Sequence, residues 1–138
     1  MTEHEKYIYW LEYAQADLDT AEFMVQSKRW LYVAFMCQQA IEKLMKGLYG
    51  LYLDFDSIPR VHNITRLAND FADKLPQPIS REYYDFFNLL SNYYINTRYP
   101  EYIESLKEKT TEGNLQEVFT KSKEVFEWLL TLKPLEKM

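Results

Sequence analysis

The sequence predicts an all-α protein, an up-and-down bundle of four to five helices in a single domain of residues 1–138. Only 3 glycines and 5 prolines occur, and no proline interrupts a long periodic segment, which suits helices because proline has no amide donor. Apolar residues recur every three or four positions rather than at every second one. Hydrophobic residues make up 47% and charged residues 27%, which is typical of a folded domain.

The first two helices are expected over about residues 5–27 and 30–53. Thr2 and Glu5 have the spacing of a capping box at the first helix start. Gln38 falls on the apolar stripe of the second helix and needs a hydrogen-bonding partner if it is buried. The stripes consist of Tyr7, Leu11, Ala14, Leu18, Ala21 and Val25 in the first helix, and of Ala34, Cys37, Ile41, Leu44, Met45, Leu48 and Tyr52 in the second.

Two further helices follow a proline-containing loop. A short helix is expected from residue 62 or 63 to about residue 72, with Asn63 as its N-cap. A fourth helix is expected over residues 80–98, because Pro100 disfavours helical geometry at Tyr99.

The C-terminal part is less uniform. Residues 101–113 are ambiguous and could form a short helix around Ile103. The last helix is expected after Asn114, whose spacing to Glu117 is again a capping-box pattern. Its inner face consists of Val118, Phe119, Val125, Phe126, Leu129 and Leu130.

Composition excludes several classes of function. One cysteine, Cys37, rules out a disulfide framework and a thiolate zinc site, and His4 and His62 are the only histidines. The net charge of −5 argues against a broad nucleic-acid footprint. The N-terminus does not resemble a signal peptide, and no apolar run reaches the ~18–20 residues of a membrane span. We therefore expect a cytoplasmic protein with no metal and no cofactor.

Charge is uneven along the chain, since residues 29–66 hold five bases and only three acids. The segment is either a solvated helix face or a modest anion-binding patch. The His62-Asn63 pair at a helix start likewise either caps the helix or holds a phosphate on free amides. The five bases are Arg29, Lys43, Lys46, Arg60 and Arg66.

The stretch from Arg98 to Tyr102 closes an aromatic-rich helix. Arg98 either interacts with the unpaired carbonyls at the end of that helix or binds a phosphate while its guanidinium stacks on Tyr94 or Tyr99. Carboxylates are a weaker candidate, because the sequence gives no distance between Asp17 and either Glu42 or Asp85.

Four pieces of sequence then form a familiar order: Trp10-Leu11 with Ala14, Asp17-Leu18 and Ala21; YVAFMCQQAIEKLMK over residues 32–46; His62-Asn63-Ile64 with Leu67; and Arg98-Tyr99-Pro100. Together, over about residues 7–130, they resemble the HEPN domain family. These small helical proteins are named for a proposed nucleotide-binding role in higher eukaryotes and prokaryotes.

The resemblance implies a bundle of four to five helices, usually a homodimer and often encoded beside a minimal nucleotidyltransferase in a toxin–antitoxin module. A large branch of the family consists of metal-independent ribonucleases with an arginine, four to six residues, and a histidine. In this chain the positions at that spacing after Arg98 hold Ile103, Glu104 and Ser105. The chain resembles the compact prokaryotic branch without the nuclease histidine, so no catalytic residue is carried over.

These observations favour a non-catalytic dimeric module that binds a nucleotide or RNA phosphate, pairs with a minimal nucleotidyltransferase, or does both. The candidate ligand contacts are Lys46, His62, Arg98, Tyr99 and Tyr102. The alternative is a metal-independent ribonuclease with a degenerate site, in which Arg98 stabilises the phosphate and Tyr99 or Tyr102 assists. A third hypothesis is a structural partner whose Arg98 only caps a helix.

Aromatic residues provide a separate reason to expect a dimer. The chain has 12 Tyr, 8 Phe and 3 Trp, more than a bundle of this size is expected to bury. Some of the aromatics near the fourth helix should then stay on a surface, and exposed apolar patches usually mark interfaces. The aromatics in question are Tyr83, Tyr84, Phe87, Tyr93 and Tyr94.

Overall fold

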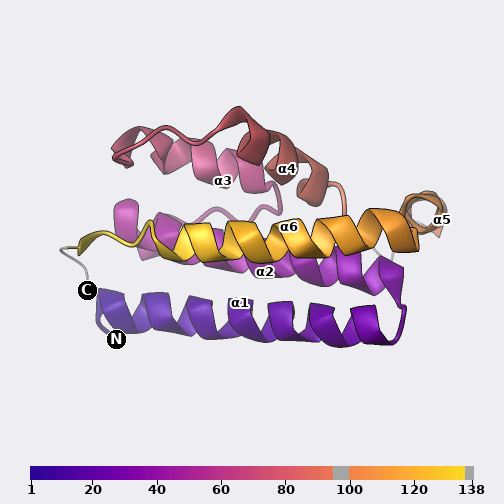
Figure 1. Cartoon of the computed structure of the whole chain (residues 1–138). Helices are drawn as coiled ribbons and strands as arrows, with labels where there is room; N and C mark the ends of the chain where they lie inside the picture. Colours follow the sequence, from indigo (N-terminus) through magenta and orange to yellow (C-terminus); the bar gives the residue numbers. More distant parts are fainter. Residues whose placement is uncertain (95–99, 136–138) are drawn as a thin grey trace.

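Helices account for all the regular structure in the part of the chain that the computed structural model describes, residues 1–94 and 100–135. The all-helical bundle predicted from the sequence is confirmed (Figure 1). The α-helices are α1 (Glu3–Gln26), α2 (Trp30–Tyr52), α3 (Ile64–Phe71), α4 (Arg81–Ser91), α5 (Pro100–Lys109) and α6 (Glu112–Leu130), with short 3₁₀ turns η1 (Phe55–Ser57) and η2 (Ala72–Lys74).

The central element is α2, which contacts each of the other described α-helices. Figure 1 shows α1 running antiparallel to α2 on one side, and α6 alongside α2 in the same direction as α2. The shorter α3 and α4 form a layer on the side of α2 away from α1, and α5 lies at the end of the bundle. Helix α2 therefore lies between α1 and the α3–α4 layer.

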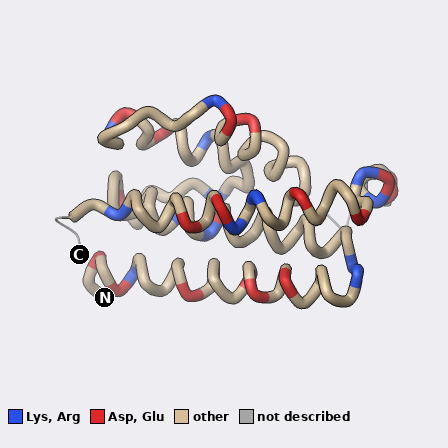
Figure 2. Tube along the Cα trace, in the orientation of Figure 1, with Lys and Arg blue, Asp and Glu red and all other residues tan. Residues whose placement is uncertain are grey.

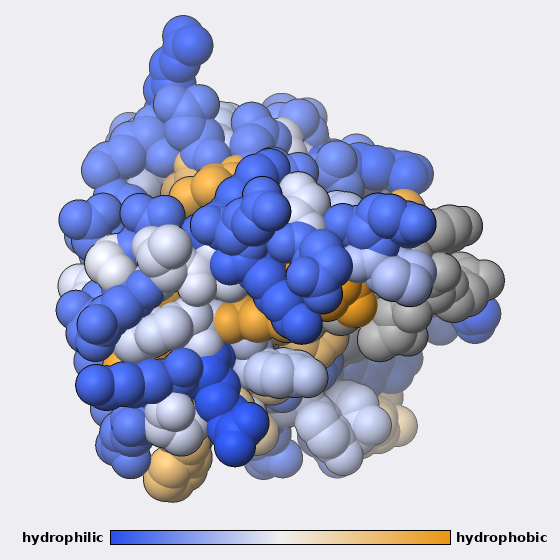
Figure 3. Space-filling view, turned by 90° about the vertical axis from the view of Figure 1, so that its right-hand side faces the viewer, coloured by the Kyte–Doolittle hydropathy of each residue, from blue (hydrophilic) through white to orange (hydrophobic). Residues whose placement is uncertain are grey.

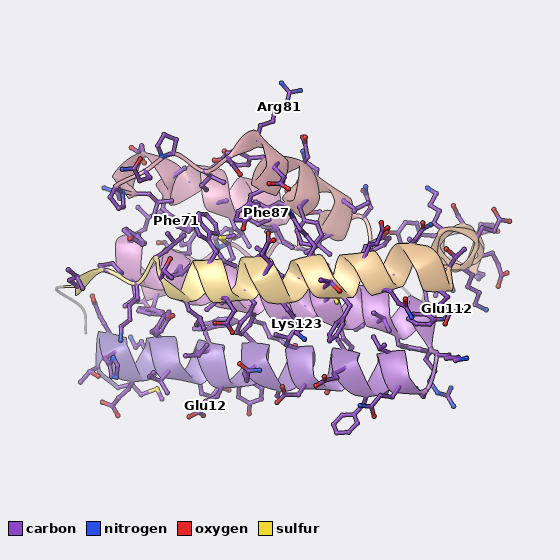
Figure 4. All side chains as sticks on the ribbon, viewed as in Figure 1. Glu12, Phe71, Arg81, Phe87, Glu112 and Lys123 are labelled. Atoms are coloured by element: carbon purple, nitrogen blue, oxygen red, sulfur yellow. The ribbon has the colours of Figure 1, made fainter. Side chains whose placement is uncertain are left out.

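The sequence of α2 explains this position. Its apolar residues occur nearly all around the helix, and such a helix has to be buried to remove them from water. Ile41, Leu44 and Leu48 are fully buried. Phe71 and Phe87 from the α3–α4 layer lie between that layer and the α2–α6 layer (Figure 4). No described helix combines the length and the apolar character that crossing a membrane requires.

Two of the predicted N-terminal caps, Thr2 and Asn63, are confirmed. The Glu5 amide donates to Thr2 Oγ1 and the Thr2 amide donates to Glu5 Oε1, each at 3.1 Å, which completes a capping box. Asn63 Oδ1 accepts the Arg66 amide at 3.1 Å and begins α3. Ser80 similarly caps α4.

The predicted end of the fourth helix is wrong, since α4 stops at Ser91 rather than near Arg98. The Asn92 and Tyr93 amides donate to carbonyls three residues back, which tightens the last turn. Ser91 Oγ also accepts the Ile64 amide at 3.0 Å, so the end of α4 is joined to the start of α3. The end of α4 therefore lies at its hydrogen bond with α3 and not next to Pro100.

The C-terminal part also differs from the prediction. The ambiguous segment forms the separate helix α5, which begins at Pro100, where a missing amide donor costs least. Thr111 rather than Asn114 caps α6, because Thr111 Oγ1 accepts the Asn114 amide and Asn114 already lies in the first turn. With α5, the number of described α-helices is six.

The expected surface aromatics are also corrected in part. Phe87 is fully buried and Tyr93 is 6% exposed, so neither is available for an interface. Tyr83, Tyr84 and Tyr94 are half-buried. Among the described residues, the aromatics that are at least half exposed lie elsewhere, on α1 and at the start of α2: Tyr9, Tyr13, Phe23 and Tyr32.

Candidate functional site

A buried carboxylate lies on α2 and collects three donors. The side chain of Glu42 is only 5% exposed. Its Oε1 accepts from Gln38 Nε2 at 2.7 Å and lies 3.0 Å from His62 Nδ1, while its Oε2 lies 3.0 Å from Lys46 Nζ. Burying a carboxylate without partners costs a great deal of free energy, so this set of donors is what allows Glu42 to be buried.

Helix geometry accounts for the contacts of Glu42 with Gln38 and Lys46. Gln38, Glu42 and Lys46 follow one another at intervals of four residues, which places them on one face of α2. The prediction that Gln38 needs a partner is confirmed, since its Nε2 also donates to the His62 carbonyl at 3.2 Å. The loop before α3 is thereby held to α2 at His62.

The His62 ring is held from two sides. It stacks on Tyr94, with ring centroids 3.6 Å apart and planes 11° from parallel. Because a carboxylate only accepts, Nδ1 carries the hydrogen in its contact with Glu42. The His62 side chain is nevertheless 44% exposed, and no partner of Nε2 lies among the described residues. A fixed imidazole therefore presents one free edge at the surface.

The first amides of α3 are already bound within the protein. The Ile64 amide donates to Ser91 Oγ, the Arg66 amide to the Asn63 side chain, and the Leu67 amide to the Asn63 carbonyl. Of the two alternatives for His62-Asn63, capping is therefore confirmed for Asn63. A phosphate at this helix start would find few free amides, and any anion contact here depends on His62.

The candidate ligand residues from the sequence separate into groups. Lys46 and His62 are brought together through Glu42, but Lys46 is 9% exposed and its charge faces that carboxylate. Tyr102 lies on α5, where its hydroxyl donates to the Asn92 carbonyl and burial raises the pKa of the phenol. Arg98 and Tyr99 lie outside the described residues.

Asp17 and Glu42, which the sequence offered as a carboxylate pair, bind different cations. Asp17 forms an ion pair with Lys43, and Glu42 binds the donors described above. Two bases of the 29–66 segment, Lys43 and Lys46, are thus paired with acids. Figure 2 shows acidic residues along α1 with basic residues near both of its ends. Because two of its five bases are paired with acids, the predicted anion-binding patch has less positive charge available for a ligand.

The described residues give little support for a cysteine nucleophile or a metal site. Burial raises the pKa of the Cys37 thiol to about 12, so the thiolate needed of a nucleophile is scarce at neutral pH. In the described ranges no group of three or more His, Cys, Asp and Glu side chains could hold a metal ion. Sequence reasoning missed the role of Glu42, and the signal for it was the polar Gln38 on an otherwise apolar stripe.

The fold and this site define a small all-helical domain in which a histidine is fixed against a buried carboxylate of the central helix. A family model described as HEPN domain matches residues 7–133. Because the match spans most of the chain, the protein belongs to the HEPN domain family.

Structural comparison agrees with the bundle. The crystal structure of TT1696 from Thermus thermophilus is similar, with a TM-score of 0.73 and 22% sequence identity over 96% of this chain and 98% of that chain. A likeness at this identity shows the fold alone. A comparison with curated proteins gave no match.

The Glu42 network makes a testable contribution to stability. Glu42→Ala leaves a buried Lys46 without its acid, and we expect unfolding free energy to fall by about 3–5 kcal/mol in urea titrations. The matched control is Glu104→Ala, which breaks an exposed pair with Lys107 and should cost about 1 kcal/mol or less. Equal, small losses in the two variants would contradict the role given to Glu42.

Proposed function

We propose that this HEPN protein is a non-catalytic, dimeric module of the cytoplasm that binds a phosphate of RNA or of a nucleotide at the exposed edge of His62. The observation that carries the proposal is the fixed imidazole, stacked on Tyr94 and bonded through Nδ1 to Glu42. With Nδ1–H bonded to Glu42, a protonated ring has its Nε2–H free to donate to an anion. Prior fixation of the ring lowers the entropy lost on binding.

Arg98 belongs to the same proposal on sequence grounds, because it follows Tyr94 by only four positions. A guanidinium is suited to phosphate because it donates two parallel hydrogen bonds. Pairing with a minimal nucleotidyltransferase, in a toxin–antitoxin-like system, is the partner relation that the family membership supports.

A metal-independent ribonuclease is the second candidate, and one contact favours it. The sequence offers no histidine at the nuclease spacing from Arg98, yet His62 stacks on Tyr94 just beyond the end of α4. An imidazole held by a carboxylate is a suitable proton carrier for phosphodiester cleavage. The other histidine, His4, is hydrogen-bonded to Lys133 and takes no part in this hypothesis.

The dimer is proposed to form through the outer face of α1. Tyr9, Tyr13 and Phe23 are 50%, 52% and 65% exposed, and their spacing places them on one side of that helix. The Tyr9 and Tyr13 rings contact each other, with centroids 4.9 Å apart. By contrast, the end of the bundle near α5 is mainly hydrophilic with small apolar areas (Figure 3). Exposed aromatics on one face are typical of an interface.

The binding proposal is tested with a fluorescently labelled single-stranded RNA that has no terminal phosphate. His62→Ala should weaken RNA binding about tenfold, because one charge-assisted hydrogen bond is lost. His4→Ala is the matched control and should bind like the wild type. Anisotropy titrations in low salt measure the affinities, and equal affinities for the two variants would remove His62 from the site.

The same RNA, incubated with protein in EDTA, separates the two candidate functions. The binding module should leave the RNA intact. Cleavage that disappears in His62→Ala would establish the ribonuclease instead.

The dimer is tested by light scattering over a range of protein concentrations. The wild type should have twice the mass of one chain, and Phe23→Ser should raise the dimer dissociation constant by at least about tenfold. Leu135→Ser removes an even more exposed apolar residue outside α1 and should have no effect. A single-chain mass at all concentrations would contradict the dimer.

A further inference from the structure

An open groove of about 570 Å³ lies between α4, the last residue of α5 and the first half of α6. Its wall residues from α4 and α6 recur at intervals of three or four positions, so each helix contributes one face. The volume is within the range of small-molecule sites. None of the described wall residues belongs to the His62 site or to the proposed dimer face on α1.

The walls of the groove are largely apolar. Phe86 of α4 and Val118 of α6 are almost completely buried within the protein. Leu89, one turn beyond Phe86, lines the same groove but is 41% exposed. A ligand that covers this leucine removes apolar surface from water, which is favourable. The groove is therefore suited to an apolar group.

Beside the groove, α4 and α6 are joined through Lys121. Lys121 Nζ lies 2.5 Å from Glu82 Oε1 and 3.2 Å from Glu124 Oε2. The Tyr83 hydroxyl donates to the same carboxylate of Glu124 at 2.9 Å, and the Tyr83 ring packs edge-on against Trp128. Because two acids already neutralise its charge, Lys121 is not the cation that a ligand would use.

Two other charges of the groove are unpaired. Lys109 at the end of α5 and Glu117 of α6 are both exposed, and neither forms an ion pair with a described residue. The Asn114 side-chain amide donates to the Lys109 carbonyl at 3.3 Å, which joins the end of α5 to the first turn of α6. A cation and an acid thus lie on the rim of one apolar groove without pairing with each other.

We propose that this groove binds a short apolar peptide with free termini, of about the size of a dipeptide. The side chains of the peptide lie against Phe86, Leu89 and Val118. Its carboxylate binds Lys109 and its ammonium group binds Glu117. A simple anion would be attracted by the lysine but repelled by the acid, whereas a zwitterion interacts favourably with both. The inference goes beyond the proposed function, since this ligand carries no phosphate and does not use the histidine.

NMR titrations with the dipeptide leucyl-phenylalanine test the proposal. The free dipeptide should cause saturable shifts in amide signals of α4 and α6. Its N-acetylated and C-amidated forms should each bind about threefold more weakly, because each loses one exposed ion pair. Glycylglycine, which has the same charges but no side chains, should bind at least about tenfold more weakly. Equal binding of glycylglycine, or no saturation by about 10 mM leucyl-phenylalanine, would overturn the proposal.

Matched variants assign the two termini of the peptide. In Lys109→Gln, amidation of the dipeptide should no longer weaken binding, whereas acetylation should still do so about threefold. In Glu117→Gln the two modifications should exchange these effects. Lys123→Gln and Glu127→Gln change exposed charges of α6 outside the groove and should behave like the wild type. A loss on amidation that persists in Lys109→Gln would contradict the assignment.

Leu89→Ser tests the apolar wall and should weaken dipeptide binding about tenfold. Leu89 is exposed enough for the fold to tolerate this change, and Leu135→Ser, outside the groove, is the control. Equal dipeptide affinities for these two variants would overturn the site.

Two crossed measurements keep the groove apart from the proposed function. His62→Ala should leave dipeptide binding unchanged, and Leu89→Ser should leave binding of the unphosphorylated RNA unchanged. Loss of dipeptide binding in His62→Ala would move the ligand to His62 and contradict the groove. Failure of RNA binding alone would contradict only the proposed function.

Discussion

The buried carboxylate of Glu42 is the constraint on which the functional face of this protein depends. An acid on the central helix of a bundle is tolerated only when donors replace the water it has lost. Two of those donors, Gln38 and Lys46, come from α2 itself, whereas His62 comes from the loop that leads into α3. The requirement to satisfy Glu42 therefore attaches that loop to α2.

Two surface features meet at Glu42. The His62 ring, fixed by Glu42, stacks on Tyr94 and leaves one edge exposed. Lys46, the other cation at Glu42, lines an open pocket between the first turns of α1 and the segment after α2. Glu42 is the common partner of His62 and Lys46, so a ligand that drew Lys46 away would also change the surroundings of His62. The two surfaces are linked by one side chain.

Local chemistry made much of the fold predictable. The positions of α1, α2 and α3 follow from apolar periodicity and from caps such as Thr2 and Asn63, which act within a few residues. The end of α4 was not predictable in this way, because Ser91 contacts Ile64, far away in the sequence. The candidate site was predicted only in part, since Glu42 and His62 are 20 positions apart and the sequence carries no local signal of their contact.

The hydrogen positions on the two histidine rings test the central role of Glu42 most directly. His62 faces a carboxylate through Nδ1, whereas His4 faces the Lys133 ammonium through Nδ1. In the neutral rings, nitrogen-detected NMR should therefore find the hydrogen on Nδ1 of His62 and on Nε2 of His4. Glu42→Gln should abolish this difference. A hydrogen on Nε2 of neutral His62 in the wild type would contradict the account.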